Sequence, residues 1–210
     1  MPDQPNTSNV SDGNTDIGMH MWYASDDKTF QQLGWRHGDK NWTFQQSWTE
    51  KNGHAGVGCY SWGGGTTTYV MFVNLNNTAE IWWKDTDTNK TSTSAHPINQ
   101  WTNASVAVNN VHPSTSLGYT NAFFAQGQDN YIYGHNITWA SENTSMSSPF
   151  KLDYAPGLPG THMSVTALPN QSGGDSLEVL YQKEGDDITY ATRDLVQGLW
   201  TASNLAVPDP

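Results

Sequence analysis

The sequence has little that could cross-link the chain or anchor it in a membrane. Cys59 is its single cysteine, so an intramolecular disulfide is excluded and the redox compartment is left open. No apolar run is long enough to cross a bilayer, and the first residues lack the charged-then-apolar pattern of a signal segment. Two interpretations of that amino terminus are open: the chain is a domain excised from a longer protein, or it is not secreted by the classical route.

Positive charge is also scarce. Nine Lys and Arg residues stand against 20 Asp and Glu residues, which gives a formal net charge of −11. Because binding to nucleic acid and to anionic membranes depends on Lys and Arg, we predict neither as a partner, and no membrane insertion. The acidic excess, together with 12% aromatic residues, fits a neutral polar ligand, although a solvated acidic surface explains the charge equally well.

Patterns typical of catalysis or metal binding are missing as well. The acidic residues form no recurrent pair that could hydrolyse a glycosidic bond, and the seven His residues are dispersed. Asp85, Asp87 and Asn89 begin like a calcium loop, but Lys90 and His96 stand where that loop requires Gly and Glu. We therefore predict no catalytic residue, no metal and no cofactor.

What the sequence does contain is a repeat. Four stretches each pair a short apolar segment with a second one, and the steps between the first residues and their partners are twelve, eleven, twelve and twelve residues. These pairs are His20 with Gln32, Tyr69 with Glu80, Asn121 with Tyr133, and Glu178 with Tyr190. A Trp then precedes a Thr at Trp42, Trp101 and Trp200, and the remaining unit has Phe150 in that place.

Strand-like repeats of about 50 residues, without any helical stripe, are typical of propeller blades. We predict an all-β protein, a β-propeller of about four to five four-stranded blades, over residues 18–210. Residues 1–17 have almost no apolar content and are expected to be a linker or disordered tail.

A propeller ring must close, or it leaves sheet edges exposed. Our hypothesis is that the carboxy-terminal strand, residues 204–207, completes the first blade and closes the ring. The alternatives are a fragment of a longer propeller and a partial ring completed by a second copy, which would make the protein a homo-oligomer.

Nine Asn-x-Ser/Thr sequons occur in the chain. Such a density is typical of a secreted glycoprotein and predicts an extracellular or cell-surface location. A sequence rich in Asn and Thr also produces sequons by chance, so this second explanation stays open.

The repeats resemble blades of the fungal fucose-specific lectins, the Aleuria-type six-bladed propellers. The resemblance is carried by residues 178–182, 185–190 and 198–201 in the last unit and by residues 77–83 in the second, and it extends over about residues 18–207. It implies a non-catalytic propeller whose partners are glycans or glycoproteins.

In that family a sugar lies between adjacent blades, held by an Arg on one strand, a Glu or Gln on the next, and the Trp of an outer strand. The resemblance places His20, Tyr69, Asn121 and Glu178 at the Arg positions, so the Arg is absent. It places Gln32, Glu80, Tyr133 and Tyr190 at the carboxylate positions. Aromatic rings are kept at Trp42, Trp101, Phe150 and Trp200.

Losing the guanidinium removes charge-assisted hydrogen bonds worth about 1.5–3 kcal/mol each, which argues against fucose specificity. The rings can still stack on the C–H face of a sugar. We therefore expect carbohydrate binding at three groups of residues: Tyr69, Glu80 and Trp101; His20, Gln32 and Trp42; and Tyr190 with Trp200. The alternative is that these rings only pack one blade on the next, in a protein-binding or structural propeller without sugar binding.

Overall fold

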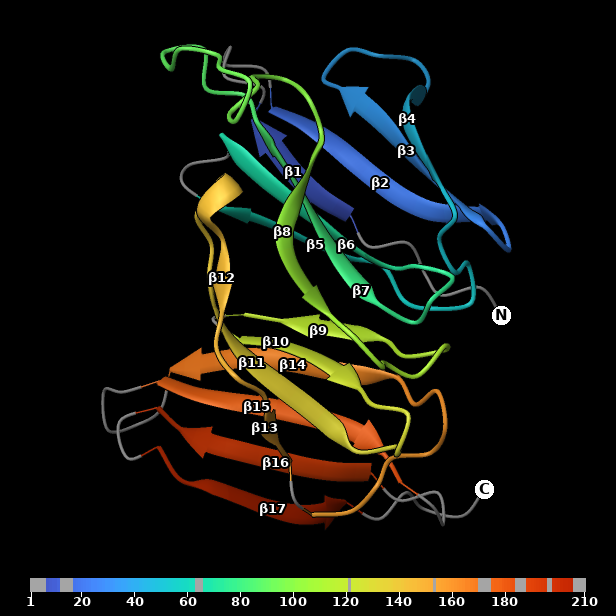
Figure 1. Ribbon diagram of the computed structural model, residues 1–210, viewed down its shortest axis with the longest axis vertical. Coiled ribbons are helices and arrows are strands. Elements are labelled where there is room, and N and C mark those ends of the chain that lie inside the picture. Colours follow the sequence, from blue (N-terminus) through green and yellow to red (C-terminus); the bar gives the residue numbers. More distant parts are fainter. Residues whose placement is uncertain are drawn as a thin grey trace. The chain divides into compact units, whose positions relative to one another are not determined.

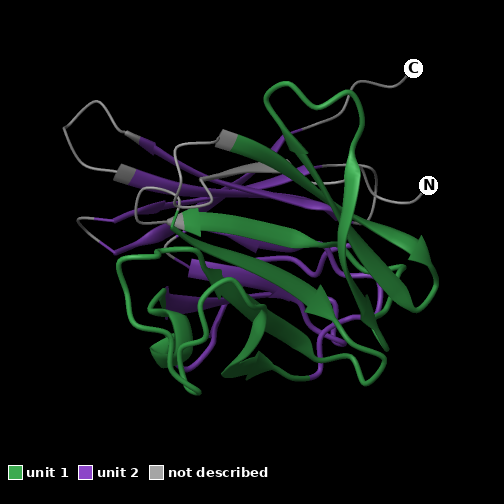
Figure 2. Cartoon of the chain, turned by 90° about the horizontal axis from the view of Figure 1, so that it is seen from above, with its two compact units in different colours: residues 1–109, 138–146 green, residues 110–137, 147–210 purple. Residues whose placement is uncertain are grey.

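The computed structural model describes residues 7–11, 17–62, 66–120, 122–152, 154–169, 175–183, 188–195 and 198–205. Contacts within the chain divide it into two compact units (Figure 2). Unit 1 comprises residues 1–109 and 138–146, and unit 2 comprises residues 110–137 and 147–210. The sequence predicted one domain from residue 18 onward, whereas each unit has a pair of sheets and a core of its own.

Unit 1 contains two four-stranded antiparallel sheets (Figure 1). The first sheet has the order β1 (Thr7–Ser11), β2 (Ile17–Asp26), β3 (Thr29–Arg36) and β4 (Thr43–Thr49). The second has the order β5 (Gly58–Trp62), β6 (Thr67–Val73), β7 (Ala79–Asp85) and β8 (Thr102–Val108). A 3₁₀ turn, η1 (Ser141–Asn143), and the short β12 (Ser145–Met146) also belong to this unit.

Unit 2 contains the third and fourth sheets, which are also antiparallel. The third is built from β9 (Leu117–Tyr119), β10 (Ala122–Gln126) and β11 (Ile132–Thr138), with β13 (Phe150–Lys151) paired to β11. The fourth has the order β14 (Met163–Pro169), β15 (Asp175–Gln182), β16 (Ile188–Asp194) and β17 (Trp200–Leu205).

Each repeat of the sequence forms the central hairpin of one sheet, so the all-β prediction is confirmed. Two of these hairpins turn in the same way. Asn77 and Asn130 have φ of 58° and 67°, the left-handed region that Asn tolerates better than most residues. The turns are closed by equivalent backbone hydrogen bonds, from Asn74 N to Thr78 O and from Gly127 N to Tyr131 O.

Both ends of the chain differ from the sequence expectation. Residues 7–11, expected to lie in a tail, form β1 and pair with β2 through the backbone, which a polar sequence does not reveal. Asn204 and Leu205 belong to β17, where they pair with Thr189 and Ile188, so they form an outer strand of the fourth sheet instead of an inner strand of the first. Residues 206 and 207 lie outside the described residues.

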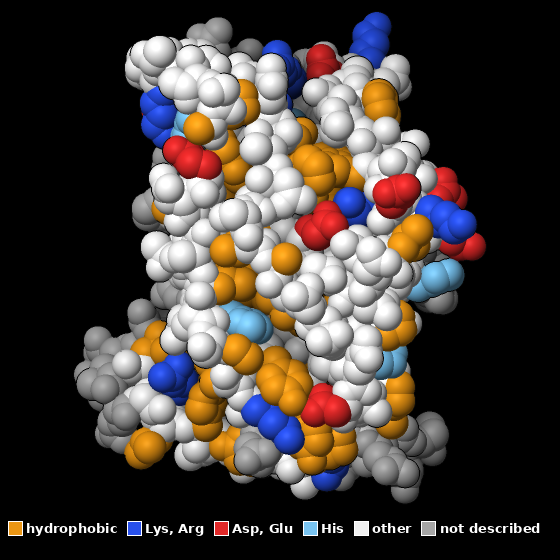
Figure 3. All heavy atoms as spheres, viewed as in Figure 1, with side chains coloured by type: hydrophobic (Ala, Val, Ile, Leu, Met, Phe, Trp, Pro, Cys, Tyr) orange, Lys and Arg blue, Asp and Glu red, His pale blue; other side chains and the backbone are white. Residues whose placement is uncertain are grey.

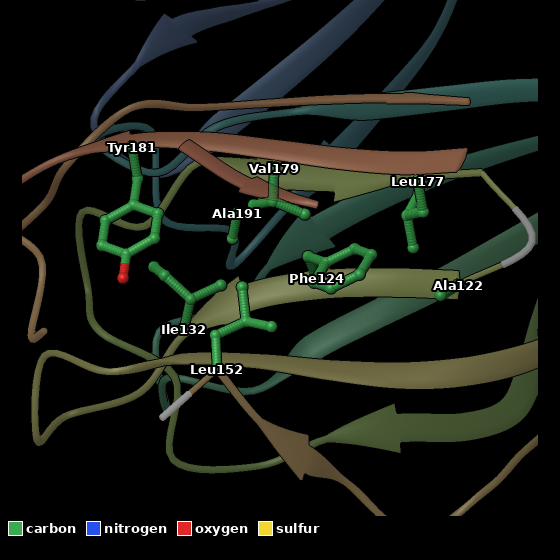
Figure 4. Packing of buried hydrophobic residues seen from close by; sticks show 8 residues of the cluster. All are labelled: Ala122, Phe124, Ile132, Leu152, Leu177, Val179, Tyr181 and Ala191. Atoms are coloured by element: carbon green, nitrogen blue, oxygen red, sulfur yellow. The ribbon is translucent and has the colours of Figure 1, made fainter. Parts of the chain in front are cut away.

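The pairs of sheets pack through apolar side chains that alternate along the strands. In unit 1 the shared core consists of Trp22, Phe30, Trp48, Val57, Cys59, Val70 and Phe72. In unit 2 it consists of Ala122, Phe124, Ile132, Leu152, Leu177, Val179, Tyr181 and Ala191 (Figure 4). In Figure 4, side chains from β10 and β15 point toward one another across this core. Burial of such surfaces is the main stabilising contribution to each unit.

A backbone link repeats where one sheet leads to the next within a unit. Asn52 N donates to Val73 O at 2.7 Å in unit 1, and Leu158 N donates to Gln182 O at 2.9 Å in unit 2. In both cases the acceptor is the last residue of the second strand of the following sheet. The loop therefore fixes the neighbouring sheet at the same point in both units. Among the described residues, no helix has the length and apolar character needed to span a membrane.

Candidate functional site

A pocket of about 510 Å³ opens between the first and second sheets of unit 1. β2 and β3 form one wall, and β6, β7 and the loop that leads into β8 form the other. Its lining residues are Gly18, His20, Trp22, Gln32, Gly34, Trp35, Arg36, Asp39, Thr43, Gln45, Thr68, Lys84, Thr86, Asn99 and Trp101.

Strand alternation explains which side chains reach the first wall. Cross-strand partners in a hairpin share a face, and every second residue along a strand returns to it. The three partner pairs on this face are Gly18 with Arg36, His20 with Gly34, and Trp22 with Gln32. The absence of side chains at Gly18 and Gly34 leaves room beside the His20 ring.

A hydrogen-bond chain joins the two walls. Trp101 Nε1 lies 3.0 Å from Gln32 Oε1, and Gln32 Nε2 lies 2.9 Å from His20 Nδ1. Because an indole N–H can only donate, it fixes the orientation of the Gln32 amide, whose NH₂ group then donates to His20 Nδ1. In the neutral imidazole the proton is therefore on Nε2. Gln32 is 3% exposed, so the chain is built into the pocket wall.

The Trp101 indole is held by edge-on contacts with two other indoles. Its ring centroid lies 6.1 Å from that of Trp22, with the planes at 84°, and 5.5 Å from that of Trp48, with the planes at 74°. These contacts and the hydrogen bond to Gln32 fix a half-buried ring that lines the pocket. A fixed ring of this kind can accept the apolar face of a ligand with little loss of conformational entropy.

The residues of the first predicted group do not come together. Tyr69 is 1% exposed, its hydroxyl accepts a hydrogen bond from Ser141 N at 2.9 Å, and its ring packs on Tyr60 and Trp139. Glu80 lies on the opposite face of the second sheet, where its partner across the strands is Phe72. The third member of the group, Trp101, lines the pocket instead.

Glu80 is engaged in a network of its own. Lys51 Nζ lies 2.9 Å from one carboxylate oxygen, and Asn74 Nδ2 donates to the other at 2.6 Å. Burial raises the pKa of Glu80, but hydrogen bonds from Lys51, Asn74 and Trp82 and the charge of Lys51 outweigh burial, so the pKa is lowered. This carboxylate is ionised and has stabilising partners within the protein.

The second predicted group is partly assembled. His20 and Gln32 are in the pocket and in contact, but Trp42, which is 37% exposed and directly precedes β4, is not among the lining residues. The aromatic ring of this pocket comes from the neighbouring sheet, in the form of Trp101. Sequence reasoning joined each pair to the Trp of its own unit.

The third predicted group is divided between two faces of the fourth sheet. Trp200 packs on Phe124 and Phe150, whereas the Tyr190 hydroxyl donates to Glu178 Oε1 at 2.5 Å. That hydrogen bond, followed by burial, raises the pKa of Tyr190. Asn121, expected at a corresponding position of the third unit, lies outside the described residues.

Several lining residues were not anticipated from the sequence. Trp22 and Arg36 follow from His20 and Gln32 by strand alternation, so the pattern contained the signal for them. Thr68, Lys84 and Asn99 come from the second sheet and its loop, and nothing local in the sequence indicates that they face the first sheet.

No model of a protein family and no curated protein matches the chain. Solved structures do match, and they are β-propellers of one type. The fold therefore belongs to the β-propeller class.

Three of these structures are lectins. AofleA from Arthrobotrys oligospora is 15% identical, with a TM-score of 0.65, over 97% of this chain and 57% of its own. The six-bladed lectin of Aleuria aurantia is 14% identical, with a TM-score of 0.62, over 98% of this chain and 61% of its own. SapL1 lectin, solved with alpha methyl fucoside, is 16% identical, with a TM-score of 0.63, over 95% of this chain and 62% of its own. The chain thus spans less than two thirds of each lectin.

Proposed function

We propose that the chain is a lectin-like carbohydrate-binding protein without catalytic activity, and that the pocket of unit 1 is a sugar site. The observation that carries the proposal is the hydrogen-bond chain from Trp101 through Gln32 to His20. It fixes an aromatic ring, an amide and an imidazole around one cavity. The likeness to lectins solved as fucose-binding propellers supports it.

The pocket has the chemistry that a sugar needs. Its volume, about 510 Å³, is in the range usual for small-molecule sites. The Trp101 ring offers a surface for sugar C–H groups, while the exposed Thr43, Gln45 and Asn99 offer polar groups to hydroxyls. Among the described lining residues Asp39 is the one carboxylate, so the pair of carboxylates used by most glycosidases is not assembled there.

Fucose is not the expected preferred ligand. The position that carries Arg in the resembling lectins is His20, whose neutral ring offers one N–H where a guanidinium offers a fork of charged donors. We expect weak single sites whose avidity grows when several are presented together, as in a homo-oligomer or a longer chain. The corresponding partners are glycans or glycoproteins, met outside the cell or at its surface.

A glycan array, followed by titration calorimetry of the hits, tests the proposal. We expect Trp101→Ala to abolish binding, and Trp101→Phe to weaken it about tenfold because the buried Gln32 oxygen then loses its donor. Tyr154→Ala, which removes an exposed aromatic side chain of unit 2, is the matched control and should bind as the wild type does. A blank array for folded protein would contradict the proposal and favour a protein-binding or structural propeller.

A further inference from the structure

We propose that the pocket selects acidic saccharides, meaning sugars that carry a carboxylate or sulfate group. The proposal rests on the proposed sugar-binding function and adds the class of ligand. It starts from two cations, Arg36 and Lys84, which line the pocket from opposite walls. Neither stands at the position where the resembling lectins carry their Arg.

Arg36 is placed beside the His20 ring by the empty site at Gly18. A Cβ atom at Gly18 would lie 3.7 Å from Arg36 Cγ and 3.8 Å from His20 Nε2. The aliphatic stem of Arg36 therefore runs next to the ring nitrogen that carries the proton in the neutral imidazole. An anionic group at this point meets a guanidinium and a ring N–H together, and a guanidinium binds a carboxylate or sulfate through a fork of donors.

Lys84 approaches from the second sheet. It is the cross-strand partner of Thr68, so both side chains stand on the face of β6 and β7 that lines the pocket. A compact ammonium on this wall and a planar guanidinium on the other can neutralise one acidic group between them, which suits a charged ligand better than a neutral one.

Two buried polar atoms point to a ligand rich in acceptors. Trp22 is 0% and Thr68 2% exposed, and both line the pocket. Within the described part of the chain, Trp22 Nε1 and Thr68 Oγ1 have no hydrogen-bond partner. An indole N–H is a donor only, so an acceptor is the group that would satisfy it. Carboxylates and sulfates are the strongest acceptors that sugars carry.

The local charge opposes the charge of the whole chain. The sequence has nine Lys and Arg residues for a net charge of −11, yet the pocket has two of them and one carboxylate, Asp39. Asp39 Oδ2 accepts the backbone N–H of Arg36 at 2.9 Å, so this carboxylate is tied to its own loop. Figure 3 shows that blue Lys and Arg side chains are sparse on the face in view, where white surface dominates. Distant acidic groups are screened beyond about 8 Å at physiological salt, so the two cations dominate inside the pocket.

The test compares matched sugars by titration calorimetry: methyl galactoside, methyl galacturonide, galactoside 6-sulfate and methyl fucoside. Wild-type protein should prefer the two acidic sugars over the neutral galactoside, and this preference should shrink when salt is raised from about 20 to about 200 mM. Arg36→Gln and Lys84→Gln should each reduce the preference about tenfold, since each removes a charged donor. Lys28→Gln, which removes an exposed cation outside the pocket, is the control.

The outcomes separate the ligand class from the proposed function. A preference for the galacturonide alone or for the sulfate alone, sensitive to both variants, supports the inference and identifies the acidic group. Trp101-dependent binding of neutral galactoside or fucoside with no acidic preference, or a preference unchanged in both variants, overturns the inference and leaves the proposed function standing. No binding of any of the four sugars by folded protein overturns both.

Discussion

The two units repeat the same aromatic contact, and around it they differ in chemistry. In unit 1 Trp101 stands edge-on to Trp22, with ring centroids 6.1 Å apart and planes at 84°. In unit 2 Trp200 stands edge-on to Phe124, with centroids 6.4 Å apart and planes at 85°. This shared contact identifies Phe124 as the counterpart of Trp22, and the strand registers then give the counterparts of the other pocket residues.

The counterparts are small or apolar wherever unit 1 is polar. Trp22 pairs with Gln32, but Phe124 pairs with Gly134. The Phe150 ring lies over Gly134, because a Cβ there would overlap that ring and lie 2.6 Å from Phe124 Cε1. An aromatic ring thus fills the space that corresponds to the Gln32 side chain.

The second wall shows the same exchange. Lys84 is the partner of Thr68 in unit 1, and Arg193 is the partner of Leu177 in unit 2. The Arg193 guanidinium lies 5.7 Å from the centre of the Phe150 ring, where it makes a cation–π contact. Leu177 needs no hydrogen bond, whereas Thr68 is buried with an unsatisfied hydroxyl within the described part of the chain.

Packing alone is therefore satisfied by the apolar set of unit 2. The polar set of unit 1 leaves buried donors without acceptors, which costs about 1–3 kcal/mol for each group. A frame that can be filled with Phe and Leu, and is instead lined with His, Gln and Thr, has a requirement beyond stability. Ligand binding is the requirement that fits the pocket.

The largest effect is expected where the filled site of unit 2 is disturbed. Gly134→Ala forces a methyl group into the Phe150 and Phe124 rings and should lower the free energy of unfolding by about 3 kcal/mol, as overpacking of a core does. Gly34→Ala is the matched change in β3, where the new Cβ meets the end of the Gln45 side chain at 3.1 Å. Because that side chain is exposed and can move, we expect a loss below about 1 kcal/mol.

Urea unfolding of both variants measures this difference. Equal losses for Gly134→Ala and Gly34→Ala would show that the Phe150 ring does not fill the corresponding space in unit 2. The comparison between a filled and an open site would then be wrong.

A smaller effect is expected from the ion pair of unit 1. The corresponding position to Glu80 in unit 2 is Thr189, so only unit 1 has an ionised group at this place in the described chain. Glu80→Gln leaves the buried Lys51 without its counter-charge and should cost about 2 kcal/mol near pH 7. Because the pKa of Glu80 is lowered in the folded protein, its contribution is present above the unfolded value of 4.5 and is lost as pH falls through the folded value.

Urea unfolding at pH 7 and near pH 3 checks this sign, with the exposed Glu50→Gln as control. The difference between wild type and Glu80→Gln should be clear at pH 7 and nearly absent at the lower pH. A difference that persists in acid would assign the effect to the lost hydrogen bonds of the carboxylate instead of its charge.

Strand positions could be predicted from the sequence, and facing partners in part. Registered partners share a face and side chains alternate, so two residues of a hairpin face the same way when their numbers differ by an even step. The step from His20 to Gln32 is twelve, and these residues meet. The step from Tyr69 to Glu80 is eleven, which places them on opposite faces. The odd step was visible in the sequence and decided the outcome.

An even step does not identify which face is presented to the neighbouring sheet. Glu178 and Tyr190 are twelve residues apart and meet, but Val179 and Ala191 form the face that packs in the core of unit 2. The partner ring is also a long-range property. Trp101 is 69 residues from Gln32, and no local pattern distinguishes it from Trp42 as the ring that completes the pocket.

The smallest and most specific effect concerns one histidine in each unit. In unit 1 His96 Nδ1 lies 2.6 Å from Glu142 and its Nε2 lies 2.7 Å from the buried Asp85, which Lys90 also contacts. Burial lowers the pKa of His96, but hydrogen bonds to Asp85 and Glu142 and their charges outweigh burial, so the pKa is raised. In unit 2 burial alone lowers the pKa of His112, whose Nδ1 accepts a hydrogen bond from Ser114 N.

The two histidines therefore respond to pH in opposite directions. The contribution of His96 is complete below the unfolded pKa of 6.5 and is lost as pH rises through its raised folded value. The neutral His112 stabilises above 6.5, and this contribution is lost as pH falls below that value. Asp85 O also accepts Asn99 N at 2.7 Å, so release of His96 should loosen the loop that carries Asn99 and Trp101 into the pocket.

Hydrogen exchange near pH 5.5 and pH 8.5, corrected for the intrinsic rate, measures both effects, each expected to be about 1 kcal/mol. Residues 86–100 should lose protection at the higher pH in the wild type, and His96→Gln should remove this pH dependence. Residues 112–116 should lose protection at the lower pH, and His112→Gln should remove that dependence without altering the first. If both loops responded in the same direction, the two carboxylates would not hold His96 in its charged form, and the pocket of unit 1 would lack a pH-dependent support.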